Sequence, residues 1–303
     1  MFLSERLRNP KESIAKVVRR SRAIRKLRSR VDSCPELNDL LELLKSGFLR
    51  FRDRIDEDLI STCKDRYGIK ESNFTRTDGN ITFPFFNAGI HDLLENSALI
   101  DVLEDYYRWM YGSPPILQII PTLVVTYPSI PQRDFVQGAH NFPASWHVDY
   151  GSEFTIHIPL EEISDKTPHT RYIAGSHTSL LRPATKRGYD SHKRVISCFA
   201  APGDALMVDV DGWHRGHLEA HGFRAMIQLK FTTGNDQLSA KALSGPKAER
   251  NALRSKESTN NYEELKQQLA TDKQYLLEQI RSGSVRGVLK ACPEYYDSFL
   301  HLA

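Results

Sequence analysis

The stretch from Gly203 to Phe231 reads GDALMVDVDGWHRGHLEAHGFRAMIQLKF, and it determines the fold class that the sequence predicts. Two apolar runs flank a segment that contains glycine, aspartate and three histidines. Short apolar runs separated by turn residues are typical of antiparallel strands. With a hairpin centred near Glu219, His214 and Arg224 are predicted to lie opposite each other, so that an imidazole and a guanidinium share one face.

Similar runs occur upstream, so the stretch belongs to a larger β region. They are rich in β-branched residues and are bounded by Pro, Gly or Asp, which favours a sandwich or barrel; they cover 116–127, 153–160, 170–175 and 194–200. We therefore expect a mainly β core with helical flanks, the core covering 116–234 as an antiparallel sandwich or barrel.

Helical patterns flank this core on both sides. Apolar spacing of three to four residues predicts one helix beginning at Pro10, a second over 35–51 and a third over 91–112, within a mostly helical region over 1–115. A further helix is predicted over 260–283, in a helical region over 235–303. We expect the three regions to form one structural domain.

Composition is that of an ordinary globular protein. The 303 residues are 40% apolar and 26% charged, and no apolar run approaches the ~18 residues of a membrane span. The amino terminus has no apolar signal region, which predicts a cytoplasmic protein. The four cysteines form no Cys-x-x-Cys pair, so neither a disulfide framework nor a zinc-thiolate site is expected.

The net charge of +3 hides a basic amino-terminal segment. Residues 1–30 carry eleven Lys or Arg against Glu5 and Glu12, a balance of +9. Four interpretations are open: a solvated basic face over an apolar stripe, contact with an anionic membrane surface or an acidic carrier-type partner, a transit peptide, or nucleic-acid binding. No nucleic-acid-binding module accompanies the charge, so a nucleic-acid partner is not expected.

The residues SWHVDYGSE, at 145–153, contain the first candidate site. Along a strand, residues two apart share a face, so His147 and Asp149 can direct an imidazole and a carboxylate to one point. Random composition predicts about one or two such His-x-acid triplets, and two occur, the second being His217-Leu218-Glu219. The triplet alone is therefore not decisive.

Combined with His214 and Arg224, the triplet suggests a specific chemistry. Two histidines and one carboxylate on one side of a metal form the facial arrangement of non-haem Fe(II) oxygenases. An arginine beside the metal can grip the far carboxylate of a dicarboxylic co-substrate in a bidentate manner. His217 and His221 compete with His214 as the distal ligand, but both fall in the expected turn.

These pieces resemble the phytanoyl-CoA dioxygenase family of Fe(II)/2-oxoglutarate-dependent oxygenases. The resemblance covers about 117–233 in the family's order and rests on five motifs: WHVD (146–149), IAGSH (173–177), PGDALMVD (202–209), HRG (214–216) and GFR (222–224). It implies a double-stranded β-helix (jelly roll, cupin-like) core with N- and C-terminal helices, and His147, Asp149 and His214 as the catalytic Fe(II) ligands. It also implies that Arg224 holds 2-oxoglutarate and that O2 takes the last open position on the metal.

Other residues are assigned with alternatives. His157 either faces the interior and contacts the co-substrate or is an ordinary core histidine, and Gln228 shares the face of Arg224 and is a candidate lining residue. Two departures from the family pattern occur: Ala174 replaces a proline, and Glu219 stands where asparagine is frequent. Asp149 is present where related halogenases carry a small residue, which favours hydroxylation over halogenation.

The resulting hypothesis is a hydroxylase acting on a C–H bond of a small-molecule substrate, with release of succinate and CO2. Desaturation, cyclisation or epimerisation can follow from the same chemistry and remain open. The alternatives from other classes are a catalytically silent jelly-roll binding or scaffold protein and a zinc-dependent cupin-like hydrolase or isomerase, in which Arg224 has no role.

Overall fold

A computed structural model describes residues 10–34, 37–52, 54–66, 69, 80–84, 98–117, 122–126, 146–149, 154–178, 189, 192–217 and 222–233. Its helices are α1 (Pro10–Arg28), α2 (Leu37–Ser46), α3 (Glu57–Arg66) and α5 (Ala98–Tyr111), with short 3-10 turns η2 (Val31–Ser33) and η5 (Ser176–Thr178). Its strands are β1 (Phe48–Phe51), β2 (Asn80–Pro84), β3 (Ile116–Leu117), β4 (Thr122–Thr126), β5 (Phe154–Pro159), β6 (His169–Ile173), β7 (Val195–Ser197), β8 (Ala205–Asp209), β9 (His214–His217) and β10 (Arg224–Thr232).

The strands form two antiparallel sheets. The larger has the order β1-β8-β5-β10-β4-β2, with β3 also paired to β10, and the smaller has the order β7-β6-β9. A single bridge between His147 and His214 adds the segment around His147 to the smaller sheet, next to β9. Each strand predicted in the β region is present, in the expected order.

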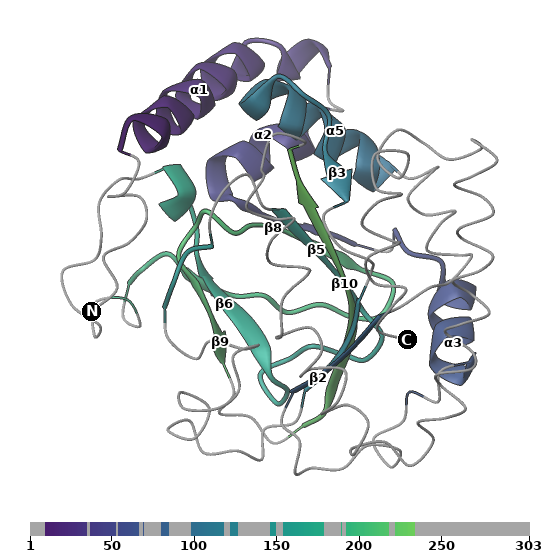
Figure 1. Cartoon of the computed structure of the whole chain (residues 1–303). Coiled ribbons are helices and arrows are strands. Elements are labelled where there is room, and N and C mark those ends of the chain that lie inside the picture. Colours follow the sequence, from purple (N-terminus) through teal and green to yellow (C-terminus); the bar gives the residue numbers. More distant parts are fainter. Residues whose placement is uncertain are drawn as a thin grey trace, which may run out of the picture.

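The larger sheet is covered on both faces. One face packs on α1, α2 and α5, and this cluster includes Leu27, Leu44, Tyr107, Phe154 and Ile156. Figure 1 shows these three helices gathered on the same side of the sheet. The other face meets the smaller sheet through a second cluster. All six residues of β5 are therefore buried, and alternate side chains reach opposite cores.

Two of the helical expectations need correction. The helix predicted from Pro35 to Phe51 ends at Ser46, because Gly47 adopts a left-handed φ of 74° and the chain continues as β1 beside β8. The apolar stripe expected on α1 is incomplete, since Ile14 and Val18 are 50% and 40% exposed, whereas Arg20 is fully buried.

Of the other helical predictions, two fall on described residues and one does not. α1 begins at Pro10 as expected, and α5 lies within the third predicted helix. The helix predicted over 260–283 lies outside the described residues. None of the helices in the described part of the chain combines the length and apolar character of a membrane span.

Candidate metal centre

The segment Trp146–Asp149 presents two of the predicted ligands on one side. His147 exchanges two backbone hydrogen bonds with His214, each 3.0 Å long, and the Asp149 N–H donates to the Val210 carbonyl at 3.0 Å. Val148 points the opposite way and is buried. The alternation expected from the sequence thus places His147 and Asp149 together, beside the start of β9.

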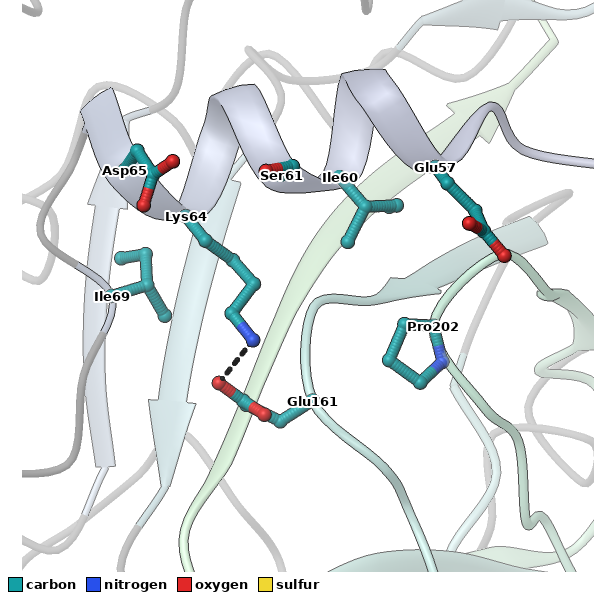
Figure 2. A pocket seen from close by; sticks show the side chains of 8 residues that line it. All are labelled: Glu57, Ile60, Ser61, Lys64, Asp65, Ile69, Glu161 and Pro202. Carbon is teal, nitrogen blue, oxygen red and sulfur yellow. Dashed lines mark ion pairs between the residues drawn. The ribbon is translucent and has the colours of Figure 1, made fainter.

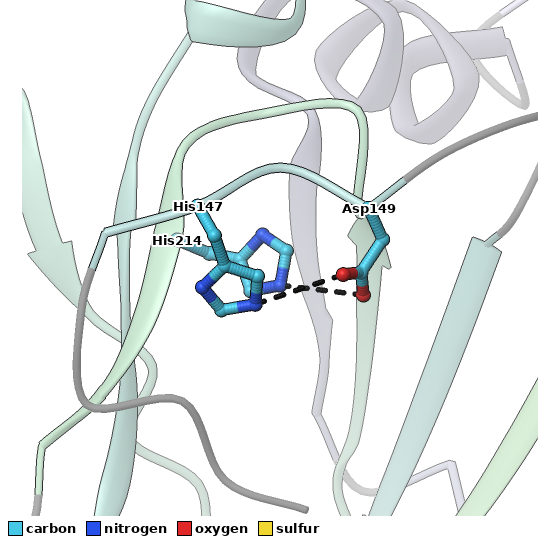
Figure 3. A group of neighbouring side chains, drawn as sticks. All are labelled: His147, Asp149 and His214. Carbon is cyan, nitrogen blue, oxygen red and sulfur yellow. Dashed lines mark ion pairs between the residues drawn. The ribbon is translucent and has the colours of Figure 1, made fainter. Parts of the chain in front are cut away.

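Three side chains converge at this point, as Figure 3 shows. His147 Nε2 lies 3.7 Å from Asp149 Oδ1, and His214 Nε2 lies 3.6 Å from Asp149 Oδ2. One ligand atom from each of the three residues lies within 4.8 Å of the other two. Atoms bound at about 2.0–2.2 Å to one ion stand about 3 Å apart, so a small closure of these side chains brings all three to bonding distance.

The protonation of the three side chains suits a divalent cation. The His214 Nδ1–H donates to the Gly212 carbonyl at 2.9 Å, which leaves the Nε2 lone pair directed toward Asp149. Burial alone would raise the pKa of Asp149, but the neighbouring His214, Lys230 and His147 hold that pKa well below its ordinary value. The carboxylate is therefore ionised at neutral pH.

Arg224 begins β10 on the inner face of the larger sheet. It is 1% exposed, and it donates to the Thr126 hydroxyl at 2.9 Å across the β10–β4 ladder. Burial lowers the pKa of Arg224 to about 9, so the guanidinium is still a cation at pH 7.

The predicted register between His214 and Arg224 is wrong. β9 pairs with β6 in the smaller sheet, where His214 lies opposite Tyr172. β10 pairs with β4 and β5 in the larger sheet. The two strands do not form a hairpin because the chain passes from one sheet to the other between them.

His157 and Gln228 are neighbours on the same inner wall. They lie opposite each other in the β5–β10 ladder, and the Gln228 amide donates to His157 Nε2 at 3.2 Å. Burial, with the charges of Arg224 and Lys230, lowers the pKa of His157 to about 3. The ring is therefore neutral at pH 7. The structure is consistent with both alternatives for His157, because a buried position on this wall serves either.

Sequence reasoning missed Lys230, which shares the inner face with Arg224 and Gln228. Its charge influences both Asp149 and His157. Extending the period-two alternation two residues beyond Gln228 would have found it. Thr126, the partner of Arg224, was also missed and has no sequence signal.

The aromatic residues and the other histidines near the candidate ligands contact neighbouring rings and backbone groups. Tyr189 stacks on Trp146 at 6.0 Å between ring centroids, and its ring is tilted against that of Trp213 at 5.0 Å. His177 is buried and hydrogen-bonds to the Leu44 carbonyl, in keeping with a structural role. His217 pairs with His169 in β9 and β6 rather than lying in a turn, whereas Glu219 and His221 lie outside the described residues.

A separate hollow of about 670 Å³ lies beside α3 (Figure 2). Ile60 and Pro202 line it, and Lys64 crosses it to form a 2.8 Å ion pair with Glu161. None of its lining residues belongs to the convergent cluster, so it does not contribute to the candidate metal centre.

Comparison with known proteins yields structural similarity only. No protein-family model matches the sequence, and no curated protein matches it significantly. Many solved structures match the fold. They include a non-haem α-ketoglutarate-dependent epimerase and proteins with 2-oxoglutarate bound.

Three of these neighbours show the level of sequence identity and structural similarity. The chain resembles SnoN, a non-haem α-ketoglutarate-dependent epimerase from nogalamycin biosynthesis, at 11% identity and a TM-score of 0.47, over 66% of this chain and 84% of SnoN. It resembles HygX from Streptomyces hygroscopicus with nickel and 2-oxoglutarate bound, at 14% identity and 0.44, over 65% and 87%. It resembles EctD from S. alaskensis with 2-oxoglutarate and 5-hydroxyectoine, at 14% and 0.44, over 64% and 74%. Such low values establish neither family membership nor a shared activity.

Proposed function

We propose that the chain is a non-haem Fe(II)/2-oxoglutarate-dependent dioxygenase that hydroxylates a C–H bond of a small organic substrate. The observation that carries this proposal is the convergence of His147, Asp149 and His214, with a buried arginine, Arg224, on the adjoining sheet. Two imidazoles and one carboxylate that leave coordination positions open are the ligand set of this class of oxygenase.

The path of the chain supports a double-stranded β-helix core. β4, β5, β8 and β10 lie in the larger sheet, whereas the His147 bridge, β6, β7 and β9 lie in the smaller one. From β4 to β10 the chain thus passes repeatedly between the two sheets, as in a jelly roll. This arrangement brings the His147 segment and β9 together although 67 residues separate the two histidines.

In this proposal His147, Asp149 and His214 hold the metal, and Fe(II) supplies the activation of O2 that is coupled to decarboxylation of 2-oxoglutarate to succinate and CO2. The hydrogen bond from His214 Nδ1–H to the Gly212 carbonyl fixes the ring so that the Nε2 lone pair is available as a metal ligand. The ionised Asp149 carboxylate offsets part of the cation's charge. Asp149 is also hydrogen-bonded through its backbone to Val210, which limits its movement.

Arg224 is proposed to bind the distal carboxylate of 2-oxoglutarate. Its planar fork suits a carboxylate, and the Thr126 hydroxyl orients one nitrogen of that fork. His157 and Gln228 lie along the same wall as neutral groups, so they orient the co-substrate by hydrogen bonding. Burial of Arg224 excludes water and strengthens its attraction for a dicarboxylate.

The substrate is proposed to approach from the side of Asp149. The Asp149 and His147 side chains are 37% and 23% exposed, whereas His214 is only 10% exposed. The charge of Lys230 acts on Asp149, so in this proposal it adds a positive charge to the surroundings of the substrate.

The test is metal-dependent formation of succinate. The purified chain is incubated with Fe(II), ascorbate, 2-oxoglutarate and a panel of small organic candidates, and succinate and hydroxylated products are measured. His147→Ala and Asp149→Ala are expected to abolish both, whereas His192→Ala, outside the convergent cluster, serves as a matched histidine control. Turnover that persists without iron, or in the Asp149→Ala protein, would overturn the proposal. A wild-type chain that neither binds metal nor forms succinate would support the catalytically silent alternative.

A further inference from the structure

Arg20 of α1 is a fully buried cation with partners far away in the sequence. Its guanidinium donates to the Asp209 carboxylate, to the Tyr106 hydroxyl at 3.0 Å and to the His177 carbonyl at 2.6 Å. A longer contact of 3.4 Å reaches Asp211. One side chain thus connects the amino-terminal helix with α5, with η5 and with the end of β8.

The charges in this cluster are matched. Burial lowers the pKa of Arg20, but the carboxylate of Asp209 and the charge of Asp211 outweigh burial and keep that pKa above its ordinary value. Lys16, one helical turn before Arg20, forms a 3.0 Å ion pair with Asp211. Two cations of α1 therefore meet two carboxylates at the end of β8, and Tyr106 adds a hydrogen bond to Asp209.

These carboxylates belong to the turn that carries the candidate metal ligands. Within the turn, Asp209 Oδ1 accepts the Asp211 N–H at 3.0 Å and the Asp209 carbonyl accepts the Gly212 N–H at 3.0 Å. The opposite side of the turn serves the metal centre: Val210 accepts the Asp149 N–H at 3.0 Å, and Gly212 accepts the His214 Nδ1–H at 2.9 Å.

A second connection reaches the same strand through η5. Arg20 binds the carbonyl of His177, and the neighbouring Ser176 hydroxyl accepts the Trp213 N–H at 2.7 Å. The residue directly before His214 is thus fixed by the turn that Arg20 also holds. The first connection reaches the backbone N–H of Asp149 and the ring of His214. The second reaches Trp213, which directly precedes His214.

We propose that Arg20 is a positioning residue for the metal centre and sets its affinity by holding the 209–212 turn. This inference rests on the proposed function. A buried ion pair adds little net stability compared with apolar side chains of similar volume. The same helix packs with apolar residues elsewhere, at Ala23 and Leu27, so stability alone does not account for a charge at position 20. Outer residues that orient metal ligands commonly set affinity.

The experiment measures metal binding by the metal-free protein, without co-substrate or turnover. Mn(II) is titrated into the full chain and free Mn(II) is followed by electron paramagnetic resonance, while circular dichroism and thermal unfolding report the fold. Arg20→Met is expected to weaken Mn(II) binding by about 10- to 100-fold, the range for outer-shell changes at metal sites. Arg22→Met, an exposed arginine on the same helix, is the matched control and should bind as wild type.

A double variant separates positioning from folding. Arg20→Met combined with Asp209→Asn removes both charges and leaves no lone buried carboxylate at position 209. Positioning by Arg20 predicts a folded double variant whose Mn(II) affinity stays at least 10-fold below wild type. Wild-type affinity in either folded variant overturns the inference and leaves the proposed function standing. If neither variant folds, Arg20 acts in folding and the inference is wrong; if the wild-type chain binds no Mn(II), the proposed function fails first.

Discussion

Replacing Arg224 by methionine is expected to make the metal-free protein more stable while removing its response to 2-oxoglutarate. Arg224 is 1% exposed, and burial lowers its pKa from the ordinary 12.5 to about 9. At pH 7 the side chain is nevertheless protonated in both the folded and the unfolded chain. The folded state therefore holds a cation that its surroundings disfavour.

The lowered pKa sets the magnitude. Each pKa unit corresponds to about 1.4 kcal/mol, so the shift of Arg224 represents a cost on the order of 5 kcal/mol. Because the folded pKa lies below the unfolded one, this cost is present in full below pH 9 and disappears as the pH rises toward 12.5. Methionine avoids the cost, and losing the hydrogen bond to Thr126 offsets about 1–3 kcal/mol. We expect a net gain of roughly 2 kcal/mol or more.

Two measurements check this prediction. Urea denaturation at pH 7 gives the free energy of unfolding of the metal-free proteins, and thermal unfolding with Mn(II) is repeated with and without 2-oxoglutarate. At 100 times its dissociation constant, the co-substrate should stabilise the wild-type protein by about 2.7 kcal/mol and the variant not at all. Arg224→Lys keeps a cation but loses the fork, so it should show a weakened response. A less stable Arg224→Met protein, or one that still responds fully, would refute the reasoning.

Three further predictions follow from the same contacts. Burial lowers the pKa of His157 to about 3 and that of His169 to about 4. As the pH falls below ~6.5, the unfolded chain protonates these two rings before the folded chain does. Each ring should therefore lower the free energy of unfolding by up to about 1.4 kcal/mol per pH unit. His169→Gln should reduce this slope by one proton's share in denaturant titrations between pH 6.5 and 4, and an unchanged slope would contradict it. A Cβ at Gly212 would lie 1.8 Å from the Tyr172 hydroxyl oxygen, so Gly212→Ala should cost about 1–3 kcal/mol in urea denaturation and weaken metal binding. Divalent metal should raise the melting temperature, EDTA should reverse the increase, and Asp149→Asn should remove it; an equal increase in Asp149→Asn would argue against the metal centre.

The strands and the convergent residues could be predicted from the sequence because their signals are local. β5, β8 and β10 each combine β-branched or apolar runs with a bounding Gly, Pro or Asp, and the structure contains all three. His147 and Asp149 share a side because they are two residues apart in an extended segment. The domain boundaries at 115 and 234 remain predictions.

Pairing between segments could not be predicted as well, because local patterns do not specify which sheet a strand joins. His214 and Arg224 are ten residues apart, and symmetry about Glu219 suggested a hairpin. The two strands instead join different sheets, with His214 opposite Tyr172 and Arg224 opposite Thr126. The predicted ladder is therefore wrong, and the proximity of the two side chains remains a prediction.

Local sequence patterns also could not predict which charged residues of the basic amino-terminal helix are buried. Helical periodicity assigns Arg20 to a polar face, because a charged residue without a partner is costly to bury. The partner, Asp209, lies 189 residues later, beyond any local pattern, and pairing with it allows the arginine to replace an apolar residue in the interface. Ile14 and Val18 are exposed because they lie outside the face of the helix that packs on the protein. That face carries Lys16, Arg20, Ala23 and Leu27. A surplus of positive charge therefore need not indicate an external anionic partner, since part of it is neutralised by carboxylates beside the candidate metal ligands.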